Sequence, residues 1–147
     1  MIRIIGVLML VLGCSFYGFY RANLLFSRKK RLYDICLFIE TAADKIRLGE
    51  QMEQIVNASG SAAGIYTENL TFLINKENLK PNDISLASDF LNGLGMGDTE
   101  GELKRCQTYK ELFKKEYVLA EQEAAQKAAL YRKLGVFLGL LIGIVMI

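Results

Sequence analysis

The sequence has no histidine and no tryptophan, and only one proline, Pro81, among its 147 residues. Without histidine, the chain lacks the side chain used most often as a general base and as a zinc ligand. It contains neither the GxxxxGK[ST] loop that binds phosphates nor the GxSxG motif of a nucleophilic serine. Its three cysteines, Cys14, Cys36 and Cys106, lie far apart and indicate neither a disulfide framework nor a metal site. We therefore expect no catalytic residue, no cofactor and no metal, and the protein is predicted not to be an enzyme.

Hydrophobic residues, in contrast, are abundant, and charged residues are distributed unevenly. The sequence is 52% hydrophobic and 23% charged, which is typical of a membrane-anchored protein. All 16 acidic residues lie between Asp34 and Glu123, whereas cations gather near the two ends of the chain. We expect the cations to lie beside lipid and the acidic middle to face away from it.

The last third of the sequence predicts one long helix that ends in an apolar segment. Residues 99–133 are amphipathic, and Thr99 and Glu102 have the spacing of a capping box. Residues 134–147 carry no charge, but as a helix they reach only about 21 Å against a hydrocarbon core of about 30 Å, so a buried core helix or a re-entrant segment competes with a membrane span. A span is favoured because Lys133 can extend to the headgroups and a second apolar segment exists. Three glycines at steps of four residues predict a helix-packing face: Gly135, Gly139 and Gly143.

Residues 2–20 form that second apolar segment, with Arg3 as their one charge. They reach roughly 28 Å as a helix, enough to cross a bilayer. The alternative is a lipoprotein signal in which Cys14 would be lipidated. A lipoprotein normally continues into a polar tether, whereas aromatic residues and then cations follow Cys14 here. The retained transmembrane helix is therefore the favoured interpretation.

The cations also predict the orientation in the membrane. More of them follow the first apolar segment than precede it, and cations again precede the last segment, so the region between the segments should be cytoplasmic and both termini outside. The basic run from Arg28 to Arg31 could bind nucleic acid, but beside a transmembrane helix its contact with anionic lipid headgroups is favoured. The predicted membrane-interface residues are Arg21, Arg28, Lys29, Lys30, Arg31, Tyr131, Arg132 and Lys133.

The middle of the chain is predicted to be helical throughout. Apolar residues recur at steps of three and four over residues 32–46, and shorter helices are expected at residues 52–56, 65–78 and from Asn82 or Asp83 to Leu91. Turns are expected at residues 59–61 and 93–97, and no strand alternation is evident. The predicted fold is all-α: transmembrane helices at 2–20 and 134–147 flank a cytoplasmic bundle at 21–133, with about five helices in that bundle.

Four stretches of this sequence resemble the stage III sporulation protein AB family: IIGVLMLVLGCSFYGFYRA, LFIETAADKIRLGEQMEQIV, DFLNGLGMGDTEGELKRC and AALYRKLGVFLGLLIGIVMI. The sequence departs from the family pattern at Gly97-Asp98, Gly101-Glu102 and Gln51-Met52. The resemblance implies a membrane protein whose helical domain is similar to the platform proteins of type II secretion and type IV pilus machines. Such a protein belongs to a channel complex between mother cell and forespore, beside an ATPase and ring proteins.

The function expected from this resemblance is a non-enzymatic assembly platform in the mother-cell membrane around the forespore. Its expected partners are the membrane, the sporulation ATPase, other channel proteins and further copies of the chain, but not nucleic acid. The ATPase is expected to dock at the turns from Gly49 to Met52 and from Gly93 to Glu102, through Asp98, Glu100 and Glu102. The alternatives are a platform in a secretion or pilus system outside sporulation, and a membrane lipoprotein or small membrane-bound enzyme.

Overall fold

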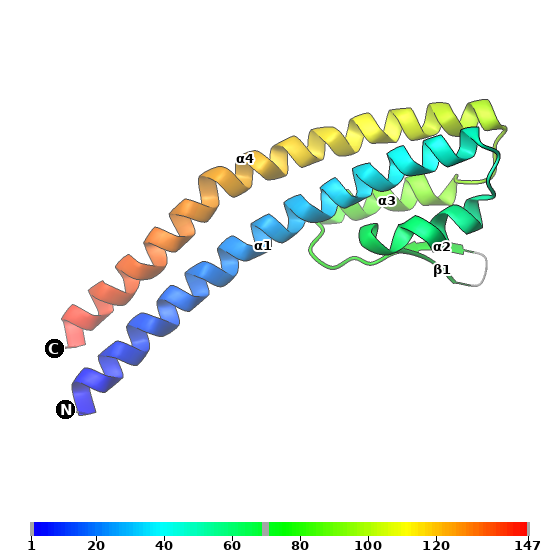
Figure 1. Ribbon diagram of the computed structural model, residues 1–147. Coiled ribbons are helices and arrows are strands. Elements are labelled where there is room, and N and C mark those ends of the chain that lie inside the picture. The colour runs from blue at the N-terminus through cyan, green and yellow to red at the C-terminus, as the bar shows by residue number, and fades with distance from the viewer. Residues whose placement is uncertain (1, 69–70, 147) are drawn as a thin grey trace. The chain divides into compact units, whose positions relative to one another are not determined.

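The computed structural model describes residues 2–68 and 71–146; the side chains of residues 2–5, 7, 10, 71, 143, 145 and 146 are outside this description. The described chain is mostly helical, and Figure 1 shows its elements. The all-α prediction is confirmed in this coarse form, with four helices and one β-hairpin in place of about five helices plus two spans. The elements are α1 Ile2–Arg47, α2 Met52–Ala63, β1 Ile65–Glu68, β2 Thr71–Ile74, α3 Pro81–Asn92 and α4 Thr99–Met146.

The elements form two compact units, and helices α1 and α4 contribute to both. The bundle unit is Arg28–Leu119, and the two-helix unit combines Met1–Ser27 with Ala120–Ile147. The separate helices expected at residues 2–20 and 32–46 are parts of the single helix α1. The long final helix from Thr99 is confirmed as α4, which continues to Met146.

Within residues 2–68 and 71–146, no helix has a stretch long and apolar enough to cross a membrane.

The bundle unit has a core of large side chains from all of its helices. Phe90 of α3 and Phe113 of α4 are 1% and 0% exposed, and Phe90 stacks on Tyr109 at 5.3 Å between ring centroids. The helical spacing seen in the sequence of residues 32–46 is confirmed by burial. The buried positions of this stretch are Leu32, Ile35, Phe38, Ile39, Ala42 and Ile46.

Residues 65–68 and 71–74 form two antiparallel strands, so the helix predicted at 65–78 is wrong. β1 and β2 pair antiparallel, with Ile65 opposite Ile74 and Tyr66 opposite Leu73. Along β1, burial alternates between buried Ile65 and exposed Tyr66. Isoleucine, tyrosine, threonine and phenylalanine are strand-favouring residues, but two strands of four residues are too short to give a clear alternation in the sequence.

The turn expected at Ser59-Gly60-Ser61 is also wrong, because α2 continues through it to Ala63. The helix ends at Gly64, which has a left-handed backbone with φ of 63° that glycine adopts without strain. Arg31 packs against Gly64 and donates to the carbonyl oxygen of Ala62 at 3.2 Å. An arginine of α1 therefore satisfies a free carbonyl at the end of α2.

Arg105 of α4 does the same for α3. Its guanidinium donates to the carbonyl oxygens of Asp89 and Phe90, at 2.5 and 3.3 Å. It also lies 5.3 Å from the ring centre of Tyr109. Each of the two short helices is thus fixed at its C-terminus by an arginine from a long helix.

Candidate functional site

The two-helix unit buries only small residues among those whose side chains are described. Its buried positions are Gly18 and Ala22 on α1 and Ala120, Ala124, Ala128, Gly135 and Gly139 on α4. They recur at steps of four residues, with one step of seven from Ala128 to Gly135, which places them on one face of each helix. We call this contact the small-residue seam.

The seam brings the two backbones very close together. A Cβ atom added to Gly18 would lie 2.6 Å from the carbonyl oxygen of Tyr131, and one added to Gly135 would lie 2.8 Å from that of Cys14. At Gly139 the nearest atom would be the Cα of Val11, at 3.0 Å. Such spacing leaves no room for a larger residue and is typical of helix pairs that pack in lipid.

Gly135 and Gly139 were expected to pack against a helix, and they lie against α1. Gly143 lies outside the residues whose surroundings are described. Sequence reasoning missed the other half of the seam. The steps of four from Cys14 to Gly18 and Ala22, and from Ala120 to Ala124 and Ala128, were the available signal.

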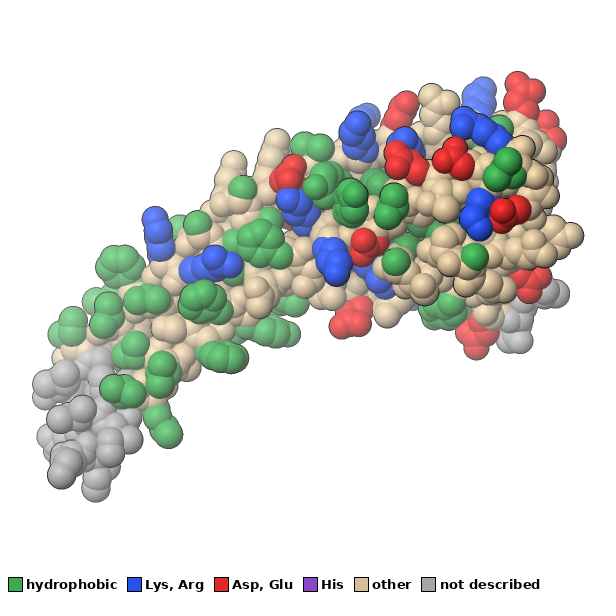
Figure 2. Space-filling view, in the orientation of Figure 1, with side chains coloured by type: hydrophobic (Ala, Val, Ile, Leu, Met, Phe, Trp, Pro, Cys, Tyr) green, Lys and Arg blue, Asp and Glu red, His purple; other side chains and the backbone are tan. Residues whose placement is uncertain are grey.

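The large apolar side chains of the two-helix unit point outward. Phe16 is 80% exposed, Met9 72% and Phe137 64%. Figure 2 shows hydrophobic side chains gathered on the visible face of this unit. A water-soluble surface rarely exposes so many contiguous large apolar residues, and such a surface is typical of contact with lipid or another protein. Other exposed members are Leu8, Leu12, Tyr17, Phe19, Tyr20, Leu134, Val136, Leu138, Leu140, Leu141, Ile142 and Ile144.

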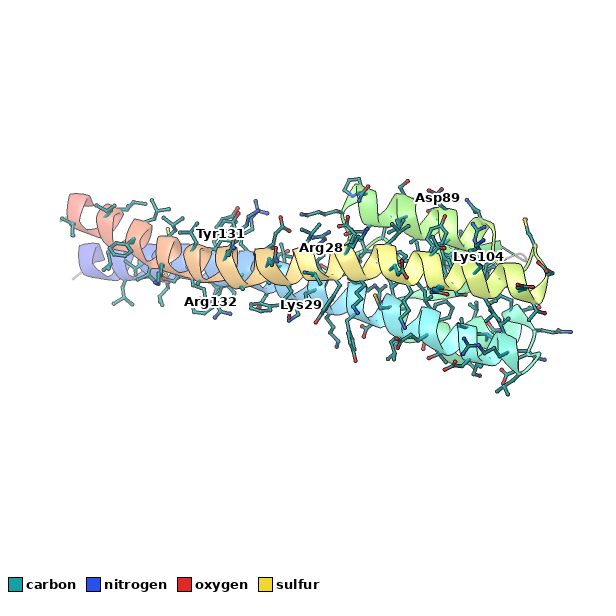
Figure 3. The ribbon with its side chains drawn as sticks, turned by 90° about the horizontal axis from the view of Figure 1, so that it is seen from above. Arg28, Lys29, Asp89, Lys104, Tyr131 and Arg132 are labelled. Atoms are coloured by element: carbon teal, nitrogen blue, oxygen red, sulfur yellow. The ribbon has the colours of Figure 1, made fainter. Side chains whose placement is uncertain are left out.

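Two arginines of this unit lie on aromatic rings. The guanidinium carbon of Arg132 is 5.5 Å from the ring centre of Phe19 and 5.8 Å from that of Phe26, which joins α4 to α1. Arg21 donates to the hydroxyl of Tyr17 at 3.3 Å, and this hydrogen bond raises the pKa of Arg21. Tyr131 and Lys133 are exposed, and Figure 3 shows Tyr131 and Arg132 on opposite sides of α4. Exposed cations beside aromatic rings suit a membrane–water interface.

Arg28 requires a correction, because it is not a surface cation. It is 6% exposed, and its guanidinium donates to both carboxylate oxygens of Asp83, at 2.8 and 2.9 Å. A further bond reaches Glu116 of α4 at 3.1 Å. Figure 3 shows Arg28 near the start of α3. The residue therefore joins three helices inside the bundle unit and is not available to lipid headgroups.

Asp83, the partner of Arg28, is completely buried. Its carboxylate also accepts the backbone N–H of Lys80 at 3.0 Å and so closes the first turn of α3, which begins at Pro81. Asn82, the other residue at which this helix was expected to begin, donates its side-chain amide to Glu116 at 3.1 Å. A buried ion pair with these extra hydrogen bonds fixes the orientation of α3.

The remaining cations of the basic run also belong to the bundle unit. Lys29 lies 5.7 Å from the ring centre of Tyr117, and Arg31 holds the end of α2 as described above. Lys30 is exposed. The run was predicted to be one lipid-facing patch. Instead, Arg28, Lys29 and Arg31 contact other helices, and Lys30 is on the surface.

The turns at residues 48–52 and 93–98 lie together; we call them the turn end of the bundle unit. A Cβ atom on Gly95 would be 3.9 Å from the Cβ of Met52, which places the two turns in contact. Gly95 has a φ of 81°, as a helix-to-helix bend requires. Leu48 and Met96 are 79% and 84% exposed. Two large apolar side chains therefore project from this end.

Three acidic residues at the turn end were candidates for partner binding, and the structure separates them. Asp98 and Glu100 are exposed. Glu102 is 6% exposed, and its carboxylate accepts the N–H groups of Gly95 and Gly97 at 2.9 and 3.1 Å. Glu102 therefore holds the turn and is corrected to a structural role, because it cannot meet a partner.

The capping box predicted for α4, between Thr99 and Glu102, is also wrong. The side chain of Asp98, not that of Thr99, accepts the N–H of Gly101 at 3.2 Å. Glu102 reaches the preceding turn instead of the residue that caps the helix. The acids at this helix start still complement its positive end.

A family model for stage III sporulation protein AB matches residues 47–147. This range includes the turn end, α2, the β-hairpin, α3 and all of α4. The chain belongs to the stage III sporulation protein AB family. No curated protein and no solved structure matches the chain.

Membership in the stage III sporulation protein AB family confirms the resemblance seen in the sequence and indicates a role in sporulation. The family is one of sporulation proteins and not a known enzyme family. The match covers the α4 half of the small-residue seam, whereas the α1 half lies before its first residue.

The cysteines of the bundle unit are packed thiols. Burial raises the pKa of both Cys36 and Cys106 to about 11, with smaller contributions from Glu40 and Glu102 respectively. At neutral pH both are protonated and poorly nucleophilic. No group of three or more potential metal ligands occurs among the described residues.

Proposed function

We propose that this protein is a non-enzymatic membrane platform of a sporulation channel complex, and that it docks a cytoplasmic ATPase. The two-helix unit would lie in the mother-cell membrane around the forespore, with both termini outside. The bundle unit would lie in the cytoplasm. The observation that carries the proposal is the inverted packing of the two-helix unit, which buries alanine and glycine and exposes its large apolar side chains.

In lipid, the exposed apolar side chains of this unit would have apolar surroundings. Apolar surface exposed to water costs roughly 25 cal/mol per Å², so the exposed large apolar side chains of this unit would be costly in water. In a bilayer that cost vanishes, and close backbone packing can hold the helices together. The aromatic-bound cations Arg21 and Arg132, with exposed Tyr131 and Lys133, would lie at the headgroups.

The turn end of the bundle unit supports the proposed contact with an ATPase. Leu48 and Met96 would be the apolar centre of the contact, and exposed Asp98 and Glu100 its acidic edge. This combination suits a partner surface with an apolar pocket and a basic rim. The acidic edge would accelerate the encounter, so binding should weaken as salt increases.

The test is binding of the detergent-solubilised full chain to the sporulation ATPase of the same organism. Asp98→Lys with Glu100→Lys should weaken binding at least tenfold at low salt, and Met96→Ala should weaken it in a salt-independent way. The matched control, Glu68→Lys with Glu77→Lys, changes the same number of exposed charges outside the two turns and should bind like the unmodified chain. Equal binding by all variants, or no binding by the unmodified chain, would contradict docking at this end.

A further inference from the structure

A groove of about 920 Å³ runs between α1 and α4 in the bundle unit. Its floor includes Ile39 and Cys106, which are each 1% exposed. Helix α3 contacts α4 through other residues, Arg105 and Tyr109, so the groove lies on a different face of α4. This face has no partner within the described chain, and neither the sequence features nor the proposed docking at the turn end uses it.

The two walls of the groove carry opposite charges. Glu40 and Asp44 stand on the α1 wall, and Lys104, Lys110 and Lys114 on the α4 wall. The ammonium group of Lys110 lies 2.5 Å from the carboxylate of Glu40, which sets the two walls level with each other. Both side chains remain about half exposed, at 43% and 49%. Acid therefore faces base across the middle of the groove.

Two residues interrupt this pattern. Glu111 lies among the lysines of the α4 wall. Arg47 lies on the α1 wall, where it pairs with Asp44 at 3.2 Å and where the register set by Glu40 and Lys110 brings it level with Lys104. A surface with this pattern is complementary to itself when rotated by 180° about an axis parallel to the groove, because the rotation puts each α1 wall over the α4 wall of the other copy.

We propose that this face pairs with the same face of a second copy of the chain, in a two-fold dimer whose axis runs parallel to α1 and α4. The other two-fold arrangement, with its axis across the groove, would place residues 28 and 119 of the two copies at opposite ends. Two copies in one membrane cannot adopt that arrangement. Charge complementarity between the walls therefore selects the occupant, a second copy, and the shared membrane of the proposed function selects its direction.

An apolar patch continues this face toward residues 28 and 119. Tyr33 and Leu37 are 53% and 48% exposed, and they precede Glu40 and Asp44 at helical steps of three and four. Val118, four residues after Lys114, is 41% exposed. Exposed ion pairs contribute little affinity, so this patch would supply most of the attraction and the charged walls the orientation. The parallel axis also keeps residues 28 and 119 of both copies at the same end, as two copies in one membrane require.

The experiment uses the full chain in detergent micelles, so that it does not depend on membrane insertion. An exposed cysteine introduced by Glu77→Cys, with Cys14→Ser, carries either a donor or an acceptor dye. The native thiols, half-buried Cys36 and buried Cys106, react slowly at neutral pH because their pKa is raised. Energy transfer between mixed donor and acceptor chains then reports self-association.

Two charge variants separate the dimer from a role of the groove within one chain. Glu40→Lys with Asp44→Lys makes both walls basic, and Lys104→Glu with Lys110→Glu makes both walls acidic. Each variant alone should lose self-association at least tenfold. A mixture of the two should recover it, because each wall then meets one of opposite charge in the other chain. Mixing could not repair damage confined to a single chain.

Tyr33→Ser with Leu37→Ser should also weaken the dimer, without changing its salt dependence. Circular dichroism checks that every variant remains helical. The proposal is overturned if the unmodified chain stays monomeric up to high micromolar concentration, if the two variants associate as well as it does, or if their mixture fails to associate.

Discussion

The bundle unit and the two-helix unit are built from the same two long helices but packed by opposite rules. The bundle unit buries phenylalanine, leucine and isoleucine and keeps its charges outside, apart from Arg28, Asp83 and Glu102. The two-helix unit buries only alanine and glycine among its described residues and exposes phenylalanine, leucine and methionine. One unit carries its own hydrophobic core, whereas the other requires apolar surroundings.

The comparison shows that helix periodicity alone does not tell which side of a helix faces the core. In the bundle unit the apolar side of α1 is the buried side, and Leu32, Ile35 and Ile39 follow it. In the two-helix unit the small side is buried, and Gly18 and Ala22 follow it. Substitutions should therefore have their largest effects at the residues that hold each unit together. These are the buried ion pair in the bundle unit and the small residues in the two-helix unit.

The largest effect is expected from Arg28→Met in the bundle unit. Loss of the guanidinium leaves the carboxylate of Asp83 buried without its charge partner, which should lower the free energy of unfolding by about 3–5 kcal/mol. Chemical denaturation of the detergent-solubilised chain measures this. The control is Arg47→Met, which removes an exposed pair with Asp44 and should cost about 1 kcal/mol or less. Equal effects of the two variants would refute a structural role of the buried pair.

The next effect is expected from Gly135→Leu in the two-helix unit. A Cβ atom there would lie 2.8 Å from the carbonyl oxygen of Cys14, so the helices must separate at a cost of about 1–3 kcal/mol. Spin labels at positions 12 and 138, with Cys14→Ser, should report a longer and broader distance. Gly13→Leu is the control, because nothing lies within 4 Å of its Cβ position. An unchanged distance in Gly135→Leu would show that the glycines are merely tolerated.

A smaller effect is expected from Glu102→Ala at the turn end. The substitution removes the acceptor of the Gly95 and Gly97 N–H groups and should cost about 1 kcal/mol or slightly more. Glu100→Ala, in the same helix turn but exposed, should change stability by about 0.5 kcal/mol at most. Thermal unfolding compares the two variants. A greater loss in Glu100→Ala would reverse the roles given to these acids.

The smallest change concerns the native thiols and requires no mutation. With a pKa of about 11, Cys36 and Cys106 should label slowly with maleimide at pH 7, and faster at the same pH when the chain is unfolded. Because folding raises both pKa values, the thiols favour the folded state below pH 9 and lose that contribution as the pH rises toward 11. An impermeant maleimide should leave both thiols unlabelled on sealed cells. Labelling there would reverse the proposed orientation.

Much of the helical framework could be predicted because its signals are local. The periodicity of residues 32–46 and the unbroken run from Thr99 gave the long helices, and Gly93 to Gly97 gave the bend between α3 and α4. The β-hairpin was missed because four residues per strand are too few to distinguish from a short apolar helix. Tertiary packing between α2 and α3 decides that segment.

The sites were harder to predict because their partners are distant in the sequence. Arg28 looked like one of a run of surface cations, and its true partner, Asp83, lies 55 residues away. Glu102 matched a local capping pattern, yet its carboxylate binds the preceding turn. The glycines of α4 were visible, but their contact with Gly18 requires knowing that α1 packs antiparallel beside them.

The most direct test of the central claim uses the absence of tryptophan from the sequence. Phe137→Trp places a single fluorophore on the outer face of the two-helix unit, and Tyr66→Trp places one on β1 of the bundle unit. In vesicles that contain brominated lipid, the tryptophan at position 137 should emit at short wavelength and be quenched, whereas the one at position 66 should be unaffected by bromine. Equal, unquenched emission from both would contradict a lipid-embedded two-helix unit.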